Sequence, residues 1–125
     1  MKEFKVFKCN TCGNIVLKML DMGPAISCCG QEMQELKAGT TDAALEKHVP
    51  AVTRNGNTIH VEVGSVLHPM TEEHWITFIA AVQGKKLQVA YLNPGDEPKA
   101  CFQVEDGPVE VYEYCNLHGL WKAEA

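Results

Sequence analysis

The stretch Ala51-Val-Thr-Arg-Asn-Gly-Asn-Thr-Ile-His-Val-Glu-Val63 decides the fold of the larger part of the chain. Its centre, Arg54-Asn-Gly-Asn57, indicates a hairpin, because Asn-Gly accepts the positive φ values of a type I′ turn. This turn joins two strands, which we predict over Ala51–Thr53 and Thr58–Val66. Apolar and polar residues alternate in the second strand, as they do when one face of a strand packs in a core.

Short alternating runs, separated by turn residues, continue along the rest of the chain. They predict further strands over Trp75–Val82, Lys86–Leu92, Ala100–Val104 and Val109–Tyr114. Regularly spaced short strands of this kind are typical of an antiparallel sandwich or barrel. Residues 41–47 have room for a turn or two of helix, and we expect the chain to be all-β apart from this segment.

The first part of the chain has a different composition. Four of the six cysteines lie within the first 29 residues, where aliphatic residues are too few to build a core. A bound metal is expected to stabilise such a segment in place of a core. Ala38–Asp42, with Gly39 and two threonines, reads as a linker. We therefore predict a metal-binding domain over residues 1–37 and a larger domain over residues 38–125.

The cysteines have the spacing of a metal site. Cys9-Asn-Thr-Cys12-Gly13 matches a metal knuckle, in which backbone amides point at the first sulfur and glycine permits the tight turn. Cys28 and Cys29 supply the other half, and adjacent cysteines cannot repeat the knuckle geometry. We predict a distorted tetrahedral centre of four sulfurs, suited to zinc or to a single iron. A purely structural zinc site and a vicinal Cys28–Cys29 disulfide are the alternatives.

A second group combines histidines in or beside loops with one late cysteine. Its members are His48, His68, His74, Cys115 and His118. Structural zinc is almost always four-coordinate, whereas iron accepts five or six ligands. Four nitrogens in a plane and a sulfur on one axis leave the opposite axial position for a small molecule. Each histidine alone is consistent with a surface side chain, and their joint occurrence with the cysteine favours an iron site.

Two residues of the same types are expected outside this group. His60 lies inside an alternating strand on the same face as Glu62, so we predict a solvent-exposed strand histidine. Cys101 is predicted to be a buried strand thiol. Trp121 has no role that the sequence indicates.

Charge and hydropathy exclude several classes of function. The net charge is −5, and residues 38–125 carry six Lys or Arg against twelve Asp or Glu. No basic patch offers phosphate contacts, so nucleic acid is not an expected partner. The chain has no signal-peptide pattern and no apolar run of membrane-spanning length. We therefore expect a cytoplasmic protein with reduced thiols and no membrane partner.

Four further motifs surround the second group of ligands: Glu46-Lys-His-Val-Pro50, Gly64-Ser-Val-Leu-His-Pro-Met70, His74-Trp75 and Tyr114-Cys-Asn-Leu-His-Gly119. Together they resemble the desulfoferrodoxin family of two-domain superoxide reductases. The four N-terminal cysteines are similar to the desulforedoxin-like domain of that family. The resemblance implies an Fe(Cys)4 centre in residues 1–37 and an immunoglobulin-like antiparallel β-sandwich over residues 38–125. It also implies a second iron with His48, His68, His74 and His118 as equatorial ligands and Cys115 as the axial ligand.

The resemblance further implies an activity and partners. The expected reaction is one-electron reduction of superoxide to hydrogen peroxide without release of dioxygen, with electrons from rubredoxin or a similar donor. Lys47 is expected near the open position of the ferrous iron, where its charge attracts superoxide. Glu46 is expected to approach that position in the ferric state. The family implies a homodimer.

Two other functions fit parts of the sequence. A blue-copper protein explains a β-sandwich with Cys115 and His118, but the usual axial methionine is missing from Gly119–Ala125. A zinc-binding interaction module explains the N-terminal cysteines and leaves the four histidines without a purpose.

Overall fold

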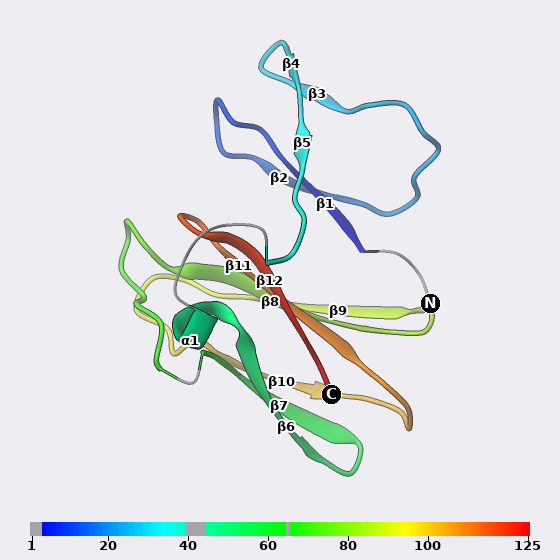
Figure 1. The fold of residues 1–125 in the computed structure, drawn as a ribbon, viewed down its shortest axis with the longest axis vertical. Helices are drawn as coiled ribbons and strands as arrows, with labels where there is room; N and C mark the ends of the chain where they lie inside the picture. Colours follow the sequence, from blue (N-terminus) through cyan, green and yellow to red (C-terminus); the bar gives the residue numbers. More distant parts are fainter. Residues whose placement is uncertain (1–3, 40–44, 65) are drawn as a thin grey trace. The chain divides into compact units, whose positions relative to one another are not determined.

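The structure is a computed structural model, which describes residues 4–39, 45–64 and 66–125. The chain divides after Lys37 into two compact units. Figure 1 shows the strands of each unit. Among the described residues, no helix is long and apolar enough to cross a membrane.

The first unit consists of short strands around very few apolar side chains. Its strands are β1 (Lys5–Lys8), β2 (Ile15–Lys18), β3 (Ser27–Cys28), β4 (Gln31–Glu32) and β5 (Gln34–Glu35). β2, β1 and β5 form one antiparallel sheet, and β3 pairs with β4. Val6, Cys9 and Met33 are its buried side chains.

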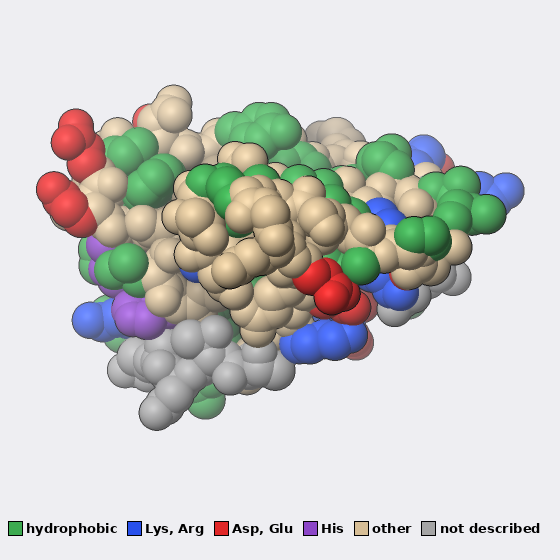
Figure 2. Space-filling view, turned by 90° about the horizontal axis from the view of Figure 1, so that it is seen from above, with side chains coloured by type: hydrophobic (Ala, Val, Ile, Leu, Met, Phe, Trp, Pro, Cys, Tyr) green, Lys and Arg blue, Asp and Glu red, His purple; other side chains and the backbone are tan. Residues whose placement is uncertain are grey.

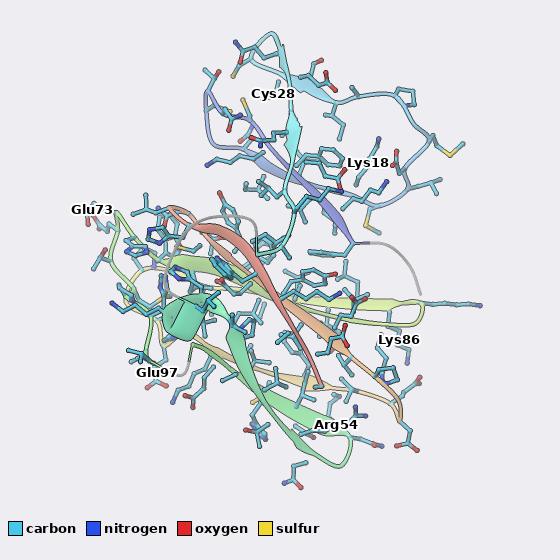
Figure 3. All side chains as sticks on the ribbon, viewed as in Figure 1. Lys18, Cys28, Arg54, Glu73, Lys86 and Glu97 are labelled. Atoms are coloured by element: carbon cyan, nitrogen blue, oxygen red, sulfur yellow. The ribbon has the colours of Figure 1, made fainter. Side chains whose placement is uncertain are left out.

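In the first unit, the carboxylate of Asp21 binds two lysines and a backbone amide. The Asp21 carboxylate accepts hydrogen bonds from Lys18 and Lys5 at 2.6 Å each and from the backbone amide of Gly23 at 2.9 Å. These bonds, that from Lys18 first, lower the pKa of Asp21 well below its usual range. Asp21 therefore fixes the loop that follows β2. Lys18, at the end of β2, is labelled in Figure 3.

The second unit is a sandwich of seven antiparallel strands. One sheet has the order β10-β7-β6, from Lys99–Gln103, Thr58–Val63 and Pro50–Asn55. The other has the order β12-β11-β8-β9, from Gly119–Glu124, Glu110–Cys115, Ile76–Gln83 and Lys86–Tyr91. A division into three and four strands is that of a constant-type immunoglobulin domain. The prediction of an all-β, immunoglobulin-like fold is confirmed.

Side chains from both sheets form the core of the sandwich. β7 contributes Ile59, Val61 and Val63, which alternate with exposed residues as period two requires. Ile79 and Val111 face them from the other sheet. At one end of the sandwich Arg54 donates hydrogen bonds to the carbonyls of Glu105 and Gly107, both at 2.6 Å (Figure 3).

Two local predictions need correction. The hairpin between β6 and β7 is shifted by one residue, because Asn55 still pairs with Thr58. Gly56 and Asn57 are therefore its central residues, and only Gly56 has positive φ, which is the pattern of a type II′ turn rather than type I′. A further strand that the sequence did not predict is β12, which pairs with β11 along its whole length.

The prediction that Cys101 is buried was wrong. On β10 the side chains of Ala100 and Phe102 face the core, so Cys101 points to the opposite, exposed face. A shift of one residue in a strand moves every side chain to the other face, and three consecutive apolar residues leave that choice open. His60 on β7 is exposed, as predicted.

Candidate metal centres

The four N-terminal cysteines lie together, as the spacing predicts. The sulfurs of Cys9, Cys12, Cys28 and Cys29 all lie within 4.8 Å of one another. The sulfur of Cys28 is 3.7 Å from that of Cys12 and 4.0 Å from that of Cys29. A regular tetrahedron with such edges has its centre about 2.3–2.5 Å from each corner, close to a metal–thiolate bond length. The cluster therefore fits one metal ion.

Two turns of the backbone create this cluster. In the first, the amide of Gly13 donates to the carbonyl of Cys9 at 2.9 Å, which closes the knuckle. In the second, Cys29 and Gly30 are the two central residues of the β3–β4 hairpin, with φ of 53° and 73°. Positive φ at both positions defines a type I′ turn. Cys29 is the one described non-glycine residue with positive φ. This turn is how two adjacent cysteines reach one centre.

Two thiols of this cluster, Cys9 and Cys29, have very different pKa values. Hydrogen bonds from the backbone amides of Cys12 and Thr11 lower the pKa of Cys9 to about 6. The sulfurs of Cys12 and Cys9 raise the pKa of Cys29 to about 12. Four thiolates this close repel one another, so full deprotonation requires a cation among them. The cluster is therefore built to bind a metal ion.

The second group of predicted ligands also lies together, in the sandwich unit. The ligand atoms of His48, His68, His74, Cys115 and His118 lie within 4.8 Å of one another. Nε2 of His48 is 3.2 Å from Nε2 of His68 and 3.0 Å from Nδ1 of His118. The Cys115 sulfur is 3.8 Å from Nδ1 of His118. His60 lies outside this cluster.

The four imidazoles form a square. Going round it in the order His48, His68, His74, His118, neighbouring ring centroids are 4.6–5.0 Å apart with interplanar angles of 76–83°. The opposite rings of His48 and His74 are 6.5 Å apart and only 26° from parallel. A square with sides of 3.0–3.2 Å has its centre about 2.2 Å from each nitrogen, near a metal–imidazole distance.

Different elements supply the corners of the square. His48 ends the short helix α1 (Leu45–His48), and the carbonyl of Leu45 accepts a bond from the amide of Val49. His68 and His74 lie in the loop between β7 and β8, and His118 lies between β11 and β12. Cys115 ends β11, where the register with β8 shifts by one residue. Such irregularities re-aim side chains near functional sites.

Hydrogen bonds hold these loops in place. His68 shares a 2.6 Å hydrogen bond between Nδ1 and the carbonyl of Pro69, so that nitrogen is the donor and Nε2 is free to bind metal. Asn116 joins two of the loops: its Oδ1 accepts from the amide of Trp75, and its Nδ2 donates to the carbonyl of Glu73, each at 2.9 Å. Asn116 therefore holds both neighbours of His74.

Trp121, for which the sequence indicates no role, contacts two histidines of the square. It is 2% exposed, and its ring stacks on His48 with centroids 5.2 Å apart. Its Nε1 donates to the carbonyl of His118 at 2.9 Å. One side chain of β12 thus positions two of the four imidazoles. This contact could not be predicted without β12, the strand that carries Trp121.

Burial favours the neutral form of two of the imidazoles, those of His68 and His74, as metal binding requires. Burial lowers the pKa of His68 to about 4, and the neighbouring histidines add to that effect. Burial and then the charges of His118, His48 and Lys47 lower the pKa of His74. Burial also raises the pKa of the Cys115 thiol, while the backbone amides of Leu117 and His118 act in the opposite direction. A bound cation would remove the remaining thiol proton.

One buried atom points directly to an absent partner. Nε2 of His74 is buried and has no hydrogen-bond partner among the described residues. Buried polar nitrogens are almost always satisfied, and the other ring nitrogens of the square converge on the same point. The five residues therefore fit a metal ion at the centre of the square, with the fully buried Cys115 sulfur on its inner side.

Glu113 is a second buried residue near the site that was not predicted from the sequence. It lies two residues before Cys115 on the core face of β11, paired with Trp121 and Ile79. The side chain is 0% exposed, and neither carboxyl oxygen has a hydrogen-bond partner among the described residues. Burial raises its pKa to about 9. The alternation of β11 was the signal that could have found it, since Val111 and Cys115 share its face.

The square reaches the surface on one side. His74 and His118 are partly exposed, and Figure 2 shows histidine side chains at the surface beside a basic side chain. Lys47 is exposed, next to His48. The side chain of Glu46 lies outside the part of the chain that the structure describes.

Comparisons with known proteins match this arrangement. The family model described as desulfoferrodoxin covers residues 40–124, and that of the desulfoferrodoxin N-terminal domain covers residues 1–36. A desulfoferrodoxin of Syntrophotalea carbinolica is 46% identical over 98% of each chain. A superoxide reductase of Thermococcus kodakarensis is 33% identical over 73% of this chain and 94% of its own. The crystal structure of the superoxide reductase from Treponema pallidum is 35% identical, with a TM-score of 0.79 over 98% of this chain and 99% of its own.

Proposed function

The chain belongs to the desulfoferrodoxin family, and on that premise we propose that it is a superoxide reductase with two iron ions, one at each cluster. The observation that carries the proposal is the square of four imidazoles with Cys115 buried on its inner side. Five protein ligands exceed the needs of structural zinc and leave one position for a small molecule. The predicted ligand roles rest on this geometry and on the family.

The two units have separate roles in this proposal. Residues 1–37 form the Fe(Cys)4 domain, and residues 38–125 form the catalytic domain. The four histidines and Cys115 would hold an iron that supplies the single electron for the reduction of superoxide to peroxide, and the Cys115 thiolate would increase its electron donation. Burial favours neutral His68 and His74, so ferrous iron held by four imidazoles and one thiolate would keep a net positive charge that attracts an anion.

Lys47 brings superoxide to the open side of the square. The catalytic domain carries twelve acidic against six basic residues, so its overall field repels an anion. Salt screens charges more distant than about 8–10 Å, which leaves the nearby cations in control. Lys47 is close enough to contribute to the lowered pKa of His74. We propose Glu46 as the carboxylate that would bind the iron in its ferric form, because carboxylates bind Fe(III) more strongly than Fe(II).

The charge of Lys47 can be tested against a matched control. Lys85, also exposed, lies in the turn after β8, whose other end pairs with Cys115. Eight strand residues separate the two ends, or about 25 Å, well beyond the screening length. Lys47→Glu is expected to slow superoxide capture about tenfold at low salt, and Lys85→Glu to leave it within about twofold. Equal rates in the two variants would contradict the role of Lys47.

Exposed aliphatic side chains beside the ligands support a docking surface for the electron donor. Leu45 precedes His48 by three residues, Leu67 precedes His68, and Leu117 precedes His118, and all three are mostly exposed. Apolar groups around a redox centre let a small protein approach while excluding water. We propose rubredoxin or a similar one-electron carrier as the partner. Leu117→Asp should slow reduction of the oxidised enzyme by that protein and leave reduction by dithionite unchanged.

We propose that the Fe(Cys)4 centre mainly folds the N-terminal unit, whose core is too small to do so alone.

The exposed Met19, Leu20 and Met22 of that unit favour a homodimer in which a second copy covers them. Six cysteines without a disulfide favour the reducing cytoplasm.

Superoxide consumption by metal-loaded variants tests the function. The anaerobically reduced wild type and a His118→Ala variant are compared with protein whose iron has been replaced by zinc. We expect rapid consumption by the wild type, a large loss in His118→Ala, and none above background with zinc, which has no redox chemistry. Equal consumption by the zinc and iron forms would rule out iron-based reduction.

A further inference from the structure

Cys101 is the one cysteine that belongs to neither metal cluster. It lies at the middle of β10, an edge strand of the three-stranded sheet, and its side chain is on the outer face. A free thiol in this position is open to small molecules from solvent. An exposed thiol has no packing role, so its chemistry depends on the side chains that contact it.

An imidazole lies against this thiol. Cys101 pairs directly with His60 across β10 and β7, and the sulfur is 3.0 Å from Nδ1 of His60. Both side chains are exposed. The antiparallel register therefore places a nucleophile and a base within hydrogen-bonding distance, which is the arrangement that activates cysteine in enzymes.

The nearby cation Lys99 is already paired with acidic side chains. Lys99, on the same face of β10, lies 3.6 Å from a carboxylate oxygen of Glu62 and 3.4 Å from one of Glu97. Gln103, the next residue on that face, is uncharged. Among the described residues, the side chain that shares a hydrogen bond with the Cys101 sulfur is His60, and its imidazole is able to take the thiol proton.

We propose that Cys101 and His60 form a peroxide-reactive pair in which the thiol is reversibly oxidised to a sulfenic acid. His60 accepts the thiol proton, and the thiolate attacks one oxygen of hydrogen peroxide. The S–O bond forms as the O–O bond breaks, and the leaving hydroxide takes the proton from the imidazolium to give water. The sulfur loses two electrons and the peroxide gains them. One small thiol can then condense with the sulfenic acid to give a mixed disulfide and water, and a second small thiol releases the reduced cysteine as the small-molecule disulfide forms.

The oxidant is the product of the reaction proposed above. Only this source of peroxide rests on the proposed function, because His60 and Cys101 lie within β7 and β10 and belong to neither metal cluster. An enzyme that releases peroxide exposes its own surface thiols to it first. The extent of Cys101 oxidation then reflects the local peroxide concentration, and small thiols reverse this oxidation.

The test follows oxidation of Cys101 in the intact, oxidised holoenzyme. Hydrogen peroxide is added in the presence of a diketone that captures sulfenic acids, and the peptide containing Cys101 is quantified by mass spectrometry over time. We expect labelling of Cys101 in the wild type. His60→Gln should slow it at least about tenfold, because the variant lacks the base.

Matched variants exclude indirect effects. Gln103→Ala changes an exposed residue on the same face of β10 and should leave the labelling rate within about twofold of wild type. Cys101→Ser should abolish the label while both irons stay bound. An absent label in the wild type, or equal rates in wild type and His60→Gln, would overturn the proposal.

Superoxide in place of added peroxide separates this proposal from the function itself. With superoxide and an electron donor, wild-type Cys101 should be labelled, and catalase should suppress that labelling. If added peroxide labels Cys101 rapidly but superoxide does not, the thiol–imidazole pair stands and the proposed enzymatic source of peroxide is contradicted.

Discussion

Replacing Trp121 with phenylalanine should destabilise both the sandwich and its metal centre. The variant loses the 2.9 Å hydrogen bond from Nε1 to the carbonyl of His118, which is worth about 1 kcal/mol. The smaller ring also leaves a gap beside His48 in a fully packed region, and together the two effects amount to roughly 2–3 kcal/mol. In a domain of this size that lowers the melting temperature by roughly 10–20 °C.

Trp75 provides the matched control. Its Nε1 also donates to a carbonyl, that of Leu92, but at 3.3 Å and from a half-buried ring. Trp75→Phe should therefore cost about 1 kcal/mol or less. Unfolding by guanidinium is followed by far-ultraviolet circular dichroism in samples of equal iron content. Trp121→Phe should also weaken iron binding in the square by about tenfold or more, since it orients two ligands. Equal unfolding midpoints and equal iron affinities in the two variants would refute this reasoning.

Three further predictions follow from other residues. Asp21→Asn should destabilise the first unit at neutral pH. Because the pKa of Asp21 is depressed in the folded state, its carboxylate stabilises the fold above the ordinary pKa of 3.8 and loses this effect as pH falls. The difference in unfolding free energy between variant and wild type should therefore vanish at low pH. The pKa of Glu113 is raised to about 9 in the folded state, so the unfolding free energy of the wild type should fall as pH rises above 4.5. Glu113→Gln removes this ionisation, and between pH 6 and 8 it should make the fall shallower by up to about 1.4 kcal/mol per pH unit. Cys12→Ser should lose one of the two irons by elemental analysis and keep peroxide production, whereas lost steady-state activity in an intact dimer would show that the first iron feeds the second.

Residues with fixed local chemistry could be predicted from the sequence. The knuckle at Cys9 and Cys12 and the loop positions of His68 and His118 carry strong signals, because tight turns and loops expose ligand atoms whatever the rest of the fold does. The alternation in Ile59–Val63 likewise predicted the core face of β7. Each of these inferences depends on a few neighbouring residues.

Features that depend on pairing between distant strands could not be predicted in the same way. The face of Cys101 is decided by its register against β7, and the contacts of Trp121 and Glu113 by the pairing of β12 with β11. A one-residue shift reverses each of these assignments. Asn116 illustrates the same limit, because its two hydrogen bonds reach residues more than forty positions away.

Counting products tests the central claim most directly. The anaerobically reduced protein, with two irons per chain, is mixed with superoxide, and hydrogen peroxide and dioxygen are measured together. A superoxide reductase yields one peroxide for each superoxide consumed and no dioxygen, with one iron per chain oxidised in a single turnover. Release of one dioxygen with every peroxide would show dismutation instead, and would contradict the account.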